Sequence, residues 1–189
     1  MNPAPTIALR EATAADAAAL AGLHSQSWRG FYRGMMSDAY LDGDIGAERA
    51  AFWANALASP PPGQAVIVAE SDGALAGFVH LHADHDPTWG SYVHALHVAA
   101  AFQGRGIGAR LMDAVGEWCE CHGTRGGVWL WVLEPNAPAR AFYERIGARN
   151  AERDVWEAPD GGRVPKFRYA WPSPQALRAG AGQATGTPT

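Results

Sequence analysis

Short apolar runs alternate along the chain with longer stretches in which apolar residues recur every three or four positions. The short runs predict β-strands, and the longer stretches predict amphipathic helices. The expected strands cover residues 6–10, 65–70, 75–82, 92–98, 127–133, 150–157 and 163–171. The expected helices begin after Thr13 and then cover about 47–58, 109–121 and 136–146.

Turn and cap residues set the limits of these elements. Thr13 with Asp16 is typical of a capping box, and Asn136 can cap the last predicted helix. Prolines 60–62 end the second helix, and residues 83–90 read as a loop. The segment 172–189 is rich in Pro, Ala, Gly and Thr, so we expect a disordered tail there.

The order of the elements is strand, two helices, three strands, helix, strand, helix and two strands. This order predicts an α+β fold with mixed strand directions. No repeat or second domain is visible, so we expect one domain over residues 1–171.

The bulk composition excludes several classes of protein. The chain has 189 residues, 48% hydrophobic and 18% charged, with a formal net charge of −4. This balance argues against a basic nucleic-acid surface. No signal-peptide pattern and no run of 18 apolar residues is present, so we expect no membrane span. The cysteines Cys119 and Cys121 are two apart on a predicted helix, which favours reduced thiols in a cytoplasmic protein.

A glycine-rich turn, Gln103-Gly104-Arg105-Gly106-Ile107-Gly108, joins the apolar strand 92–98 to an amphipathic helix. The first amides of a helix lack acceptors and attract anions, and glycine lets the backbone approach a phosphate. The turn has no P-loop lysine, and Leu111 stands where a dinucleotide fingerprint needs its third glycine. A phosphorylated ligand is the favoured interpretation, and a connector without a ligand is the alternative.

The turn fits the pattern Gln/Arg-x-x-Gly-x-Gly/Ala and so resembles the GNAT family, the GCN5-related N-acetyltransferases. The resemblance covers about Ile7 to Trp171. It implies an α+β GNAT fold, in which helices flank a central mixed, mostly antiparallel sheet of six to seven strands in three α/β/α layers. It also implies that acetyl-CoA binds as co-substrate. The implied contacts on the strand and the turn are Leu96, His97, Val98, Gln103, Gly104, Arg105, Gly106, Ile107, Gly108 and Ala109.

The strand before this turn carries a candidate base. Strand alternation places Tyr92, His94, Leu96 and Val98 on one face and Val93, Ala95 and His97 on the other. The run resembles the corresponding strand of arylalkylamine N-acetyltransferases. That match puts His94 at a base position and leaves Tyr92 in place of a second histidine. A neutral histidine can take the proton of an amine. A packed core histidine is the alternative, and Glu70 and His80 are weaker candidates for the base.

The segment 136–148 resembles the family pattern Asn-x-x-Ala-x-x-Phe-Tyr-x-x-x-Gly-Phe, with Ala148 in place of the last Phe. The resemblance implies that Asn136 contacts the cofactor arm and that Tyr143 lies near the thioester sulfur. A tyrosine hydroxyl is protonated at neutral pH, so Tyr143 can act as the acid for a departing thiolate. Phe142 is expected to be a core aromatic.

Two further groups of residues concern other ligands. Trp28 and Tyr32 are four apart on a helix and share a face, so they can bind an amine acceptor or simply pack in the core. The histidines and aspartates of segment 80–86 invite a metal interpretation. We expect no metal, because three or four oriented ligands are needed and this loop offers none fixed in place.

These observations predict an acetyl-CoA-dependent N-acetyltransferase that acts on a primary amine of a small molecule by direct attack in a ternary complex. A protein or peptide N-acetyltransferase and a non-catalytic acyl-CoA-binding module are the alternatives. The expected partners are acetyl-CoA and an amine acceptor, without nucleic acid or membrane. The oligomeric state stays open, with a homodimer as one option.

Overall fold

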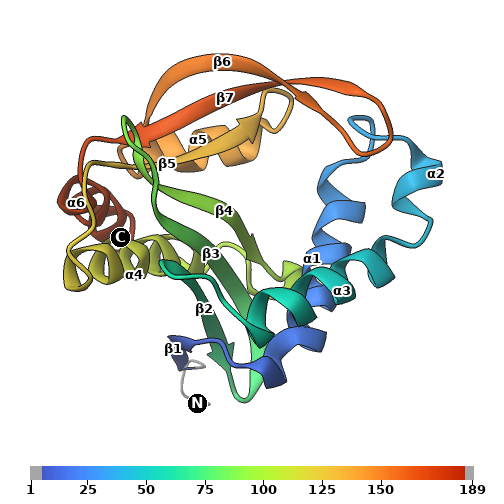
Figure 1. Cartoon of the computed structure of the whole chain (residues 1–189), viewed down its shortest axis with the longest axis horizontal. Coiled ribbons are helices and arrows are strands. Elements are labelled where there is room, and N and C mark those ends of the chain that lie inside the picture. Colours follow the sequence, from blue (N-terminus) through green and yellow to red (C-terminus); the bar gives the residue numbers. More distant parts are fainter. Residues whose placement is uncertain (1–5, 186–189) are drawn as a thin grey trace.

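A computed structural model of the protein describes residues 6–185, in which seven strands form one sheet flanked by helices (Figure 1). The strands are β1 (Ile7–Glu11), β2 (Gln64–Ser71), β3 (Ala74–Asp86), β4 (Gly90–Val98), β5 (Val128–Leu133), β6 (Arg149–Glu157) and β7 (Arg163–Trp171). The α-helices are α1 (Ala17–Phe31), α2 (Asp38–Leu41), α3 (Ile45–Ala58), α4 (Ile107–Cys121), α5 (Ala137–Arg145) and α6 (Pro174–Thr185).

The sheet is mixed and mostly antiparallel, as the sequence predicts. Its strand order is β1-β2-β3-β4-β5-β7-β6, and only β4 and β5 run parallel to each other. Because side chains alternate along a strand, β2 sends Val66 and Val68 into a core with α1 and α3. Ile67 points the other way, into a core with α4. The sheet therefore lies between two helical layers, which confirms the expected three-layer arrangement.

The parallel pair β4 and β5 is joined at one end only. The two strands pair at Ser91 with Val128 and at Tyr92 with Trp129. The rings of Tyr92 and Trp129 stack there with centroids 4.4 Å apart. Beyond this point the strands separate (Figure 1). The facing edges of both strands consequently keep backbone groups that can pair with an extended ligand.

The prediction of a disordered tail over 172–189 is wrong for residues 174–185, which form helix α6. Leu177 and Ala181 of this helix are completely buried in the core under α4. Arg178 forms ion pairs with two acids of α4, at 3.2 and 2.7 Å. The composition is misleading because α6 packs through small residues, which contribute little to a hydrophobicity pattern. The last part of the predicted tail, residues 186–189, lies outside the described residues.

Other element boundaries differ from the prediction by a few residues. The largest difference is in β3, which continues to Asp86 through the first half of the predicted loop 83–90. The capping box before α1 is confirmed, because the backbone amide of Thr13 donates to Asp16 Oδ2 at 2.7 Å. No helix within residues 6–185 combines the length and the apolar character that a membrane crossing requires.

We expect Gly180→Ala to lower the free energy of unfolding by about 1–3 kcal/mol. A Cβ atom at Gly180 would lie 2.0 Å from the carbonyl oxygen of Ile146, so α6 would have to move away from the end of α5. The matched control is Gly182→Ala in the same helix, where a Cβ would meet no atom within 4 Å. Urea unfolding of both variants measures the difference, and equal stabilities would contradict the close packing of α6.

Candidate active site

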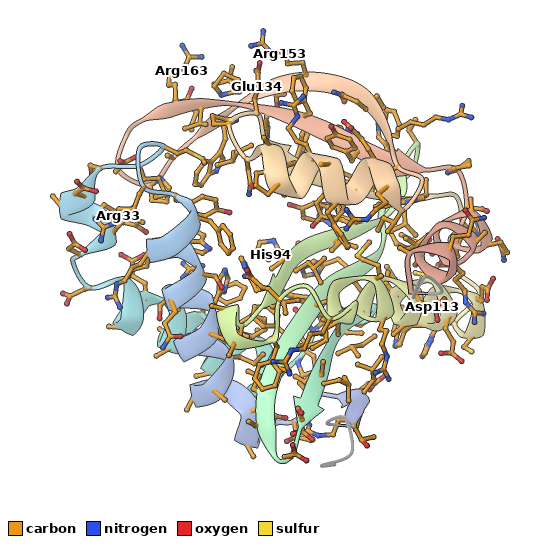
Figure 2. All side chains as sticks on the ribbon, turned by 180° about the vertical axis from the view of Figure 1, so that it is seen from behind. Arg33, His94, Asp113, Glu134, Arg153 and Arg163 are labelled. Carbon is orange, nitrogen blue, oxygen red and sulfur yellow. The ribbon has the colours of Figure 1, made fainter. Side chains whose placement is uncertain are left out.

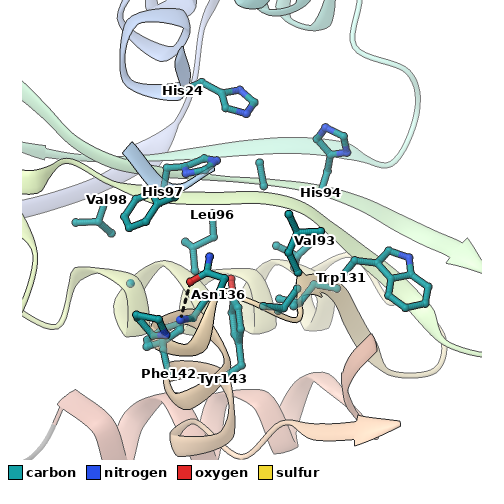
Figure 3. Close-up of a pocket in the computed structure, with 18 of the residues that line it drawn as sticks. His24, Val93, His94, Leu96, His97, Val98, Trp131, Asn136, Phe142 and Tyr143 are labelled. Carbon is teal, nitrogen blue, oxygen red and sulfur yellow. Dashed lines mark hydrogen bonds between the residues drawn. The ribbon is translucent and has the colours of Figure 1, made fainter. Parts of the chain in front are cut away.

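A cavity of about 1000 Å³ occupies the space where β4 and β5 separate. The glycine turn after β4 lines one end of it, and side chains of α1 and α3 line the other. Figure 3 shows β4 crossing this space, with His24 and His94 on one side and Tyr143 on the other. The volume lies at the upper end of the range for small-molecule sites, so it can hold an extended ligand together with a second, smaller one.

The glycine turn has the backbone of an anion site. Gly104 and Gly106 have φ angles of 75° and 74°, in the left-handed region that glycine adopts without strain. The first helical hydrogen bond of α4 runs from the amide of Arg110 to the carbonyl of Gly106, at 3.1 Å. The three amides before Arg110 therefore have no helical acceptor and can donate to an anion. The Gln103 side chain donates to the carbonyl of Val98 at 3.2 Å and braces the turn.

The cavity brings together almost all of the residues that the sequence singles out. Those that line it are Trp28, Tyr32, His94, Leu96, His97, Val98, Gln103, Gly104, Gly106, Ile107, Gly108, Ala109, Asn136 and Tyr143. Arg105 does not line it: this residue is exposed, and its guanidinium carbon lies 5.5 Å from the ring centroid of Phe102.

Helix α5 places Asn136 and Tyr143 at the gap. Asn136 precedes the helix, and its Oδ1 accepts a hydrogen bond from the amide of Ala139 at 3.2 Å, which confirms the predicted cap. This bond uses the oxygen and leaves the side-chain NH₂ group to face a ligand. Phe142 approaches Gly108 so closely that a Cβ there would lie 3.2 Å from the ring. Gly108 thus allows α4 to pack closely against α5.

Strand β4 carries a bulge at His94. Across β3, His80 pairs with Ala95 and Leu81 pairs with Val93, so no residue stands opposite His94. An extra residue in one strand bends it and shifts the alternation of side chains by one position.

Because of the bulge, the side chains of β4 are divided between its two faces differently from the simple alternation that the sequence predicts. His94 and His97 both lie on the α1 and α3 side, where their rings contact Phe52 and His24 (Figure 3). Leu96 and Val98 pack into the core under α4, although the simple alternation groups them with His94. The bulge therefore lets one short strand present a histidine to one side of the gap and an apolar surface to the other.

His94 is exposed to the cavity, yet the surrounding protein lowers its pKa to about 4. Loss of water is the main cause, and the positive charges of His82 and Arg49 add to it. Burial also lowers the pKa of His97 to about 4 and that of His24 to about 2. These histidines are neutral at pH 7, so a free ring nitrogen is available to accept a proton.

Tyr143 faces the gap from the opposite side of β4 (Figure 3). Its ring centroid lies 5.0 Å from that of Phe142 and 6.2 Å from that of Trp171. Burial raises the pKa of Tyr143 well above its usual value near 10. The phenol is therefore protonated at neutral pH and can donate a proton.

Comparison with known proteins agrees with this geometry. A family model described as the acetyltransferase (GNAT) family matches residues 25–148, which include the central strand, the glycine turn and α5. The chain belongs to the acetyltransferase (GNAT) family. The resemblance seen in the sequence motifs is thereby confirmed.

Individual relatives extend this result. A probable N-acetyltransferase of Mycobacterium tuberculosis is 30% identical over 175 residues, which cover 89% of this chain and 95% of that protein. An uncharacterized N-acetyltransferase of Archaeoglobus fulgidus is 37% identical over 95 residues, which cover 46% of this chain and 61% of that protein. Among solved structures, the PaiA N-acetyltransferase of Thermoplasma acidophilum in complex with coenzyme A has a TM-score of 0.67 at 18% identity. That match covers 87% of this chain and 99% of the other and confirms the fold.

In this GNAT family member, aromatic side chains close the cavity end at α1 and α3. We call the group Trp28, Tyr32, Phe52 and Trp156 the aromatic wall. Trp28 and Tyr32 meet edge to face with centroids 5.2 Å apart, and Trp156 of β6 lies 6.2 Å from each. Sequence reasoning missed Trp156, because only the folded β6–β7 hairpin brings it to α1.

Sequence reasoning also missed Arg49 of α3. Its guanidinium carbon lies 4.8 Å from the ring centroid of Trp28 and 5.3 Å from that of Phe52. The sequence did contain a signal for Arg49. This residue stands three positions before Phe52 and four before Trp53, so it shares their face of the helix. A cation on the apolar face of a helix is unusual enough to mark a candidate site residue.

A second cavity, of about 330 Å³, reaches His94 from beside α3. His80 lines it, is only 1% exposed, and has no hydrogen-bond partner on either ring nitrogen within residues 6–185. The ring centroid of His80 lies 5.1 Å from that of His94 and 4.5 Å from that of His82. Burial lowers the pKa of His80 to about 3, so this imidazole is neutral too.

The aspartates of segment 80–86 make hydrogen bonds that hold the backbone in place. Asp84 Oδ1 accepts from the amide of Arg125 at 2.6 Å, and Asp86 Oδ1 accepts from the amides of Thr88 and Trp89. Over the described range of the chain, no three His, Cys, Asp or Glu side chains are arranged to hold a metal ion. Asp86 therefore fixes the turn between β3 and β4, and Asp84 ties β3 to the loop before β5.

We expect the free energy of unfolding to fall as the pH decreases from 7 to 5. Carboxylates are ionised in both states over this window, whereas the buried histidines bind protons only when the chain unfolds. His80→Leu removes one such group. The slope of the free energy of unfolding against pH should therefore decrease by up to about 1.4 kcal/mol per pH unit in this variant. Denaturant unfolding at several pH values measures both slopes, and parallel curves would show that His80 does not carry this penalty.

Proposed function

We propose that this protein is an acetyl-CoA-dependent N-acetyltransferase that transfers the acetyl group to a primary amine of a small molecule, by direct attack in a ternary complex. The observation that carries this proposal is the continuity of the cavity. It joins an anion-binding turn, through the gap between β4 and β5, to an end closed by aromatic side chains.

The cofactor end supports acetyl-CoA as the co-substrate. The free amides at the start of α4 suit a pyrophosphate, as the family resemblance implies. The edge of β4 from Leu96 to Val98 faces the gap without a strand partner, so it can pair with the amide groups of the pantetheine arm. The side-chain NH₂ of Asn136 adds a donor along the same path.

A base and an acid lie on opposite sides of β4. The ammonium of the acceptor loses a proton to His94, directly or through a water molecule, and the free amine attacks the thioester carbonyl carbon. As the new C–N bond forms, the C–S bond breaks and Tyr143 donates its proton to the departing sulfur. The acylated nitrogen then loses its second proton to His94, which has already released the first one, and water reprotonates Tyr143. Because His94 has a pKa of about 4, it passes its proton on readily, and the second cavity beside His80 offers a path outward.

The closed end favours small acceptors over peptides. Trp156 contacts both Trp28 and Tyr32, and the amide of Ser37 donates to Asp160 Oδ2 at 2.5 Å. These contacts tie the β6–β7 hairpin to the segment after α1. A peptide needs an open groove at this position, whereas a small amine needs only the enclosed space.

Calorimetric titration with acetyl-CoA and CoA tests the cofactor site. We expect wild-type protein to bind both, and Gly106→Glu to lose binding because a carboxylate would stand where the phosphates bind. The control is Gly73→Glu, which places the same residue at a similar φ angle, 78° against 74°, in the hairpin turn between β2 and β3. Equal binding by the two variants, or no binding by wild-type protein, would contradict the proposal.

Release of free CoA thiol in the presence of a panel of amines and peptides tests the reaction. For the best amine, we expect Tyr143→Phe to lower kcat by roughly 10²–10⁴ with little change in the affinity for acetyl-CoA. Full turnover by this variant would remove Tyr143 from the acid role. Tight binding of acetyl-CoA without turnover of any acceptor would instead indicate a binding module, and turnover of peptides alone would indicate a peptide acetyltransferase.

A further inference from the structure

Arg49 is a mostly buried cation that lacks an anionic partner at hydrogen-bond distance. Its side chain is 16% exposed, and its Nε is buried without a hydrogen-bond partner in residues 6–185. The nearest carboxylate oxygen, Glu48 Oε2, lies 3.9 Å from an Arg49 nitrogen, beyond hydrogen-bond distance. That oxygen already accepts from the hydroxyl of Tyr40 at 2.7 Å.

Arg140 and Arg168 each also have one buried guanidinium nitrogen without a partner, but each donates another hydrogen bond, whereas the Arg49 side chain makes none within residues 6–185. Arg153 and Arg163 form ion pairs at the outer edge of the β6–β7 hairpin and point away from the molecule (Figure 2). Arg29, on α1, is partly buried and donates to the carbonyls of Leu41 and Gly43 at 2.9 and 3.4 Å. A guanidinium removed from water normally has such acceptors. The missing acceptor of Arg49 is therefore to be sought in a ligand.

Arg49 lies where the acceptor is expected to bind. It lines the main cavity beside the aromatic wall, and Phe52 separates it from His94. The rings of Phe52 and His94 are stacked with centroids 5.7 Å apart. A small molecule whose nitrogen is near His94 can therefore extend past Phe52 toward the guanidinium.

The charge around this position selects the sign of the ligand group. Arg49 is the cation at this end of the main cavity, Arg145 and Lys166 line it elsewhere, beside Phe142 and Trp131, and no Asp or Glu of the described residues lines it. Arg49 already covers one face of Trp28, so a cationic substrate group would meet a like charge at that ring. An anion is attracted instead, and a carboxylate fits a guanidinium with two parallel hydrogen bonds.

We propose that the acceptor is an aminocarboxylate with an apolar or aromatic side group, such as a free amino acid, and that its carboxylate binds Arg49. This inference rests on the proposed function and narrows its substrate class. The aromatic wall then holds the side group, and the amine faces the thioester. Positive charge near the bound amine also favours loss of the ammonium proton, which the reaction requires.

Matched pairs of acceptors test this proposal, since each pair shares its amine and differs only in the carboxylate. Suitable pairs are phenylalanine with phenethylamine, leucine with 3-methylbutylamine, and 5-aminopentanoate with butylamine, with 1,5-diaminopentane as the dicationic comparison. We expect the carboxylated member of at least one pair to have the higher kcat/KM. Arg49→Met should reduce that preference about 10- to 100-fold, the usual range for losing a hydrogen-bonded charge partner, and Arg49→Lys should restore part of it.

Arg145→Met is the matched control, because it removes a cation that lines the same cavity on α5, where its guanidinium carbon lies 5.7 Å from the ring centroid of Phe142. In this variant the ratio of kcat/KM for the carboxylated acceptor to kcat/KM for its plain amine should stay the same. Acetyl transfer to plain amines or to the diamine, without preference for a carboxylate, would overturn this inference and leave the proposed function standing. Thermal stabilisation of the CoA-loaded protein by amino acids, lost in Arg49→Met, provides a second readout that needs no turnover. Acetyl-CoA binding without turnover of any amine would overturn the proposed function itself.

Discussion

The site depends on how β4 and β5 are held together at one end and apart at the other. At the joined end, Gly90 and Gly127 approach so closely that a Cβ on Gly90 would lie 2.2 Å from the carbonyl oxygen of Gly127. The amide of Ser91 donates to the same carbonyl at 2.9 Å, and the stacked rings of Tyr92 and Trp129 follow. Beyond these contacts the strands diverge, and the sheet gains a cavity within its own plane. A fully paired sheet would leave neither the space nor the free backbone groups.

The cavity is also an unusual electrostatic environment. Its histidines are kept neutral by burial and by one another, and its fixed charges are positive at both ends. Such a space suits phosphates at the glycine turn and a neutral amine at the reacting centre. It also makes Arg49 of α3, whose guanidinium has no hydrogen-bonded carboxylate, more attractive to an anionic group than it would be in water.

The bulge at His94 connects the packing of the sheet with the chemistry proposed for it. Without the extra residue, His94 would share a face with Leu96 and Val98 and would point into the core under α4. With the bulge it points toward α1 and α3, opposite Tyr143, while the apolar residues of the strand keep their places in the core (Figure 3). A base and an acid on opposite sides of one strand can serve the two ends of the bond being exchanged.

Local patterns in the sequence determined most of the elements, the glycine turn, the Asn136 cap and the family. They do so because capping, turn conformation and the exposure of helical amides depend on neighbouring residues only. Helix α6 was misjudged, since its packing relies on the close approach of Gly180 to Ile146 rather than on apolar periodicity. Only the tertiary structure decided the bulge, the separation of β4 from β5, and the contacts of Trp28 with Arg49 and Trp156. The reason is physical: strand register, ring contacts and the pairing of a buried charge depend on residues far apart in the chain, and no local pattern records which of them will meet.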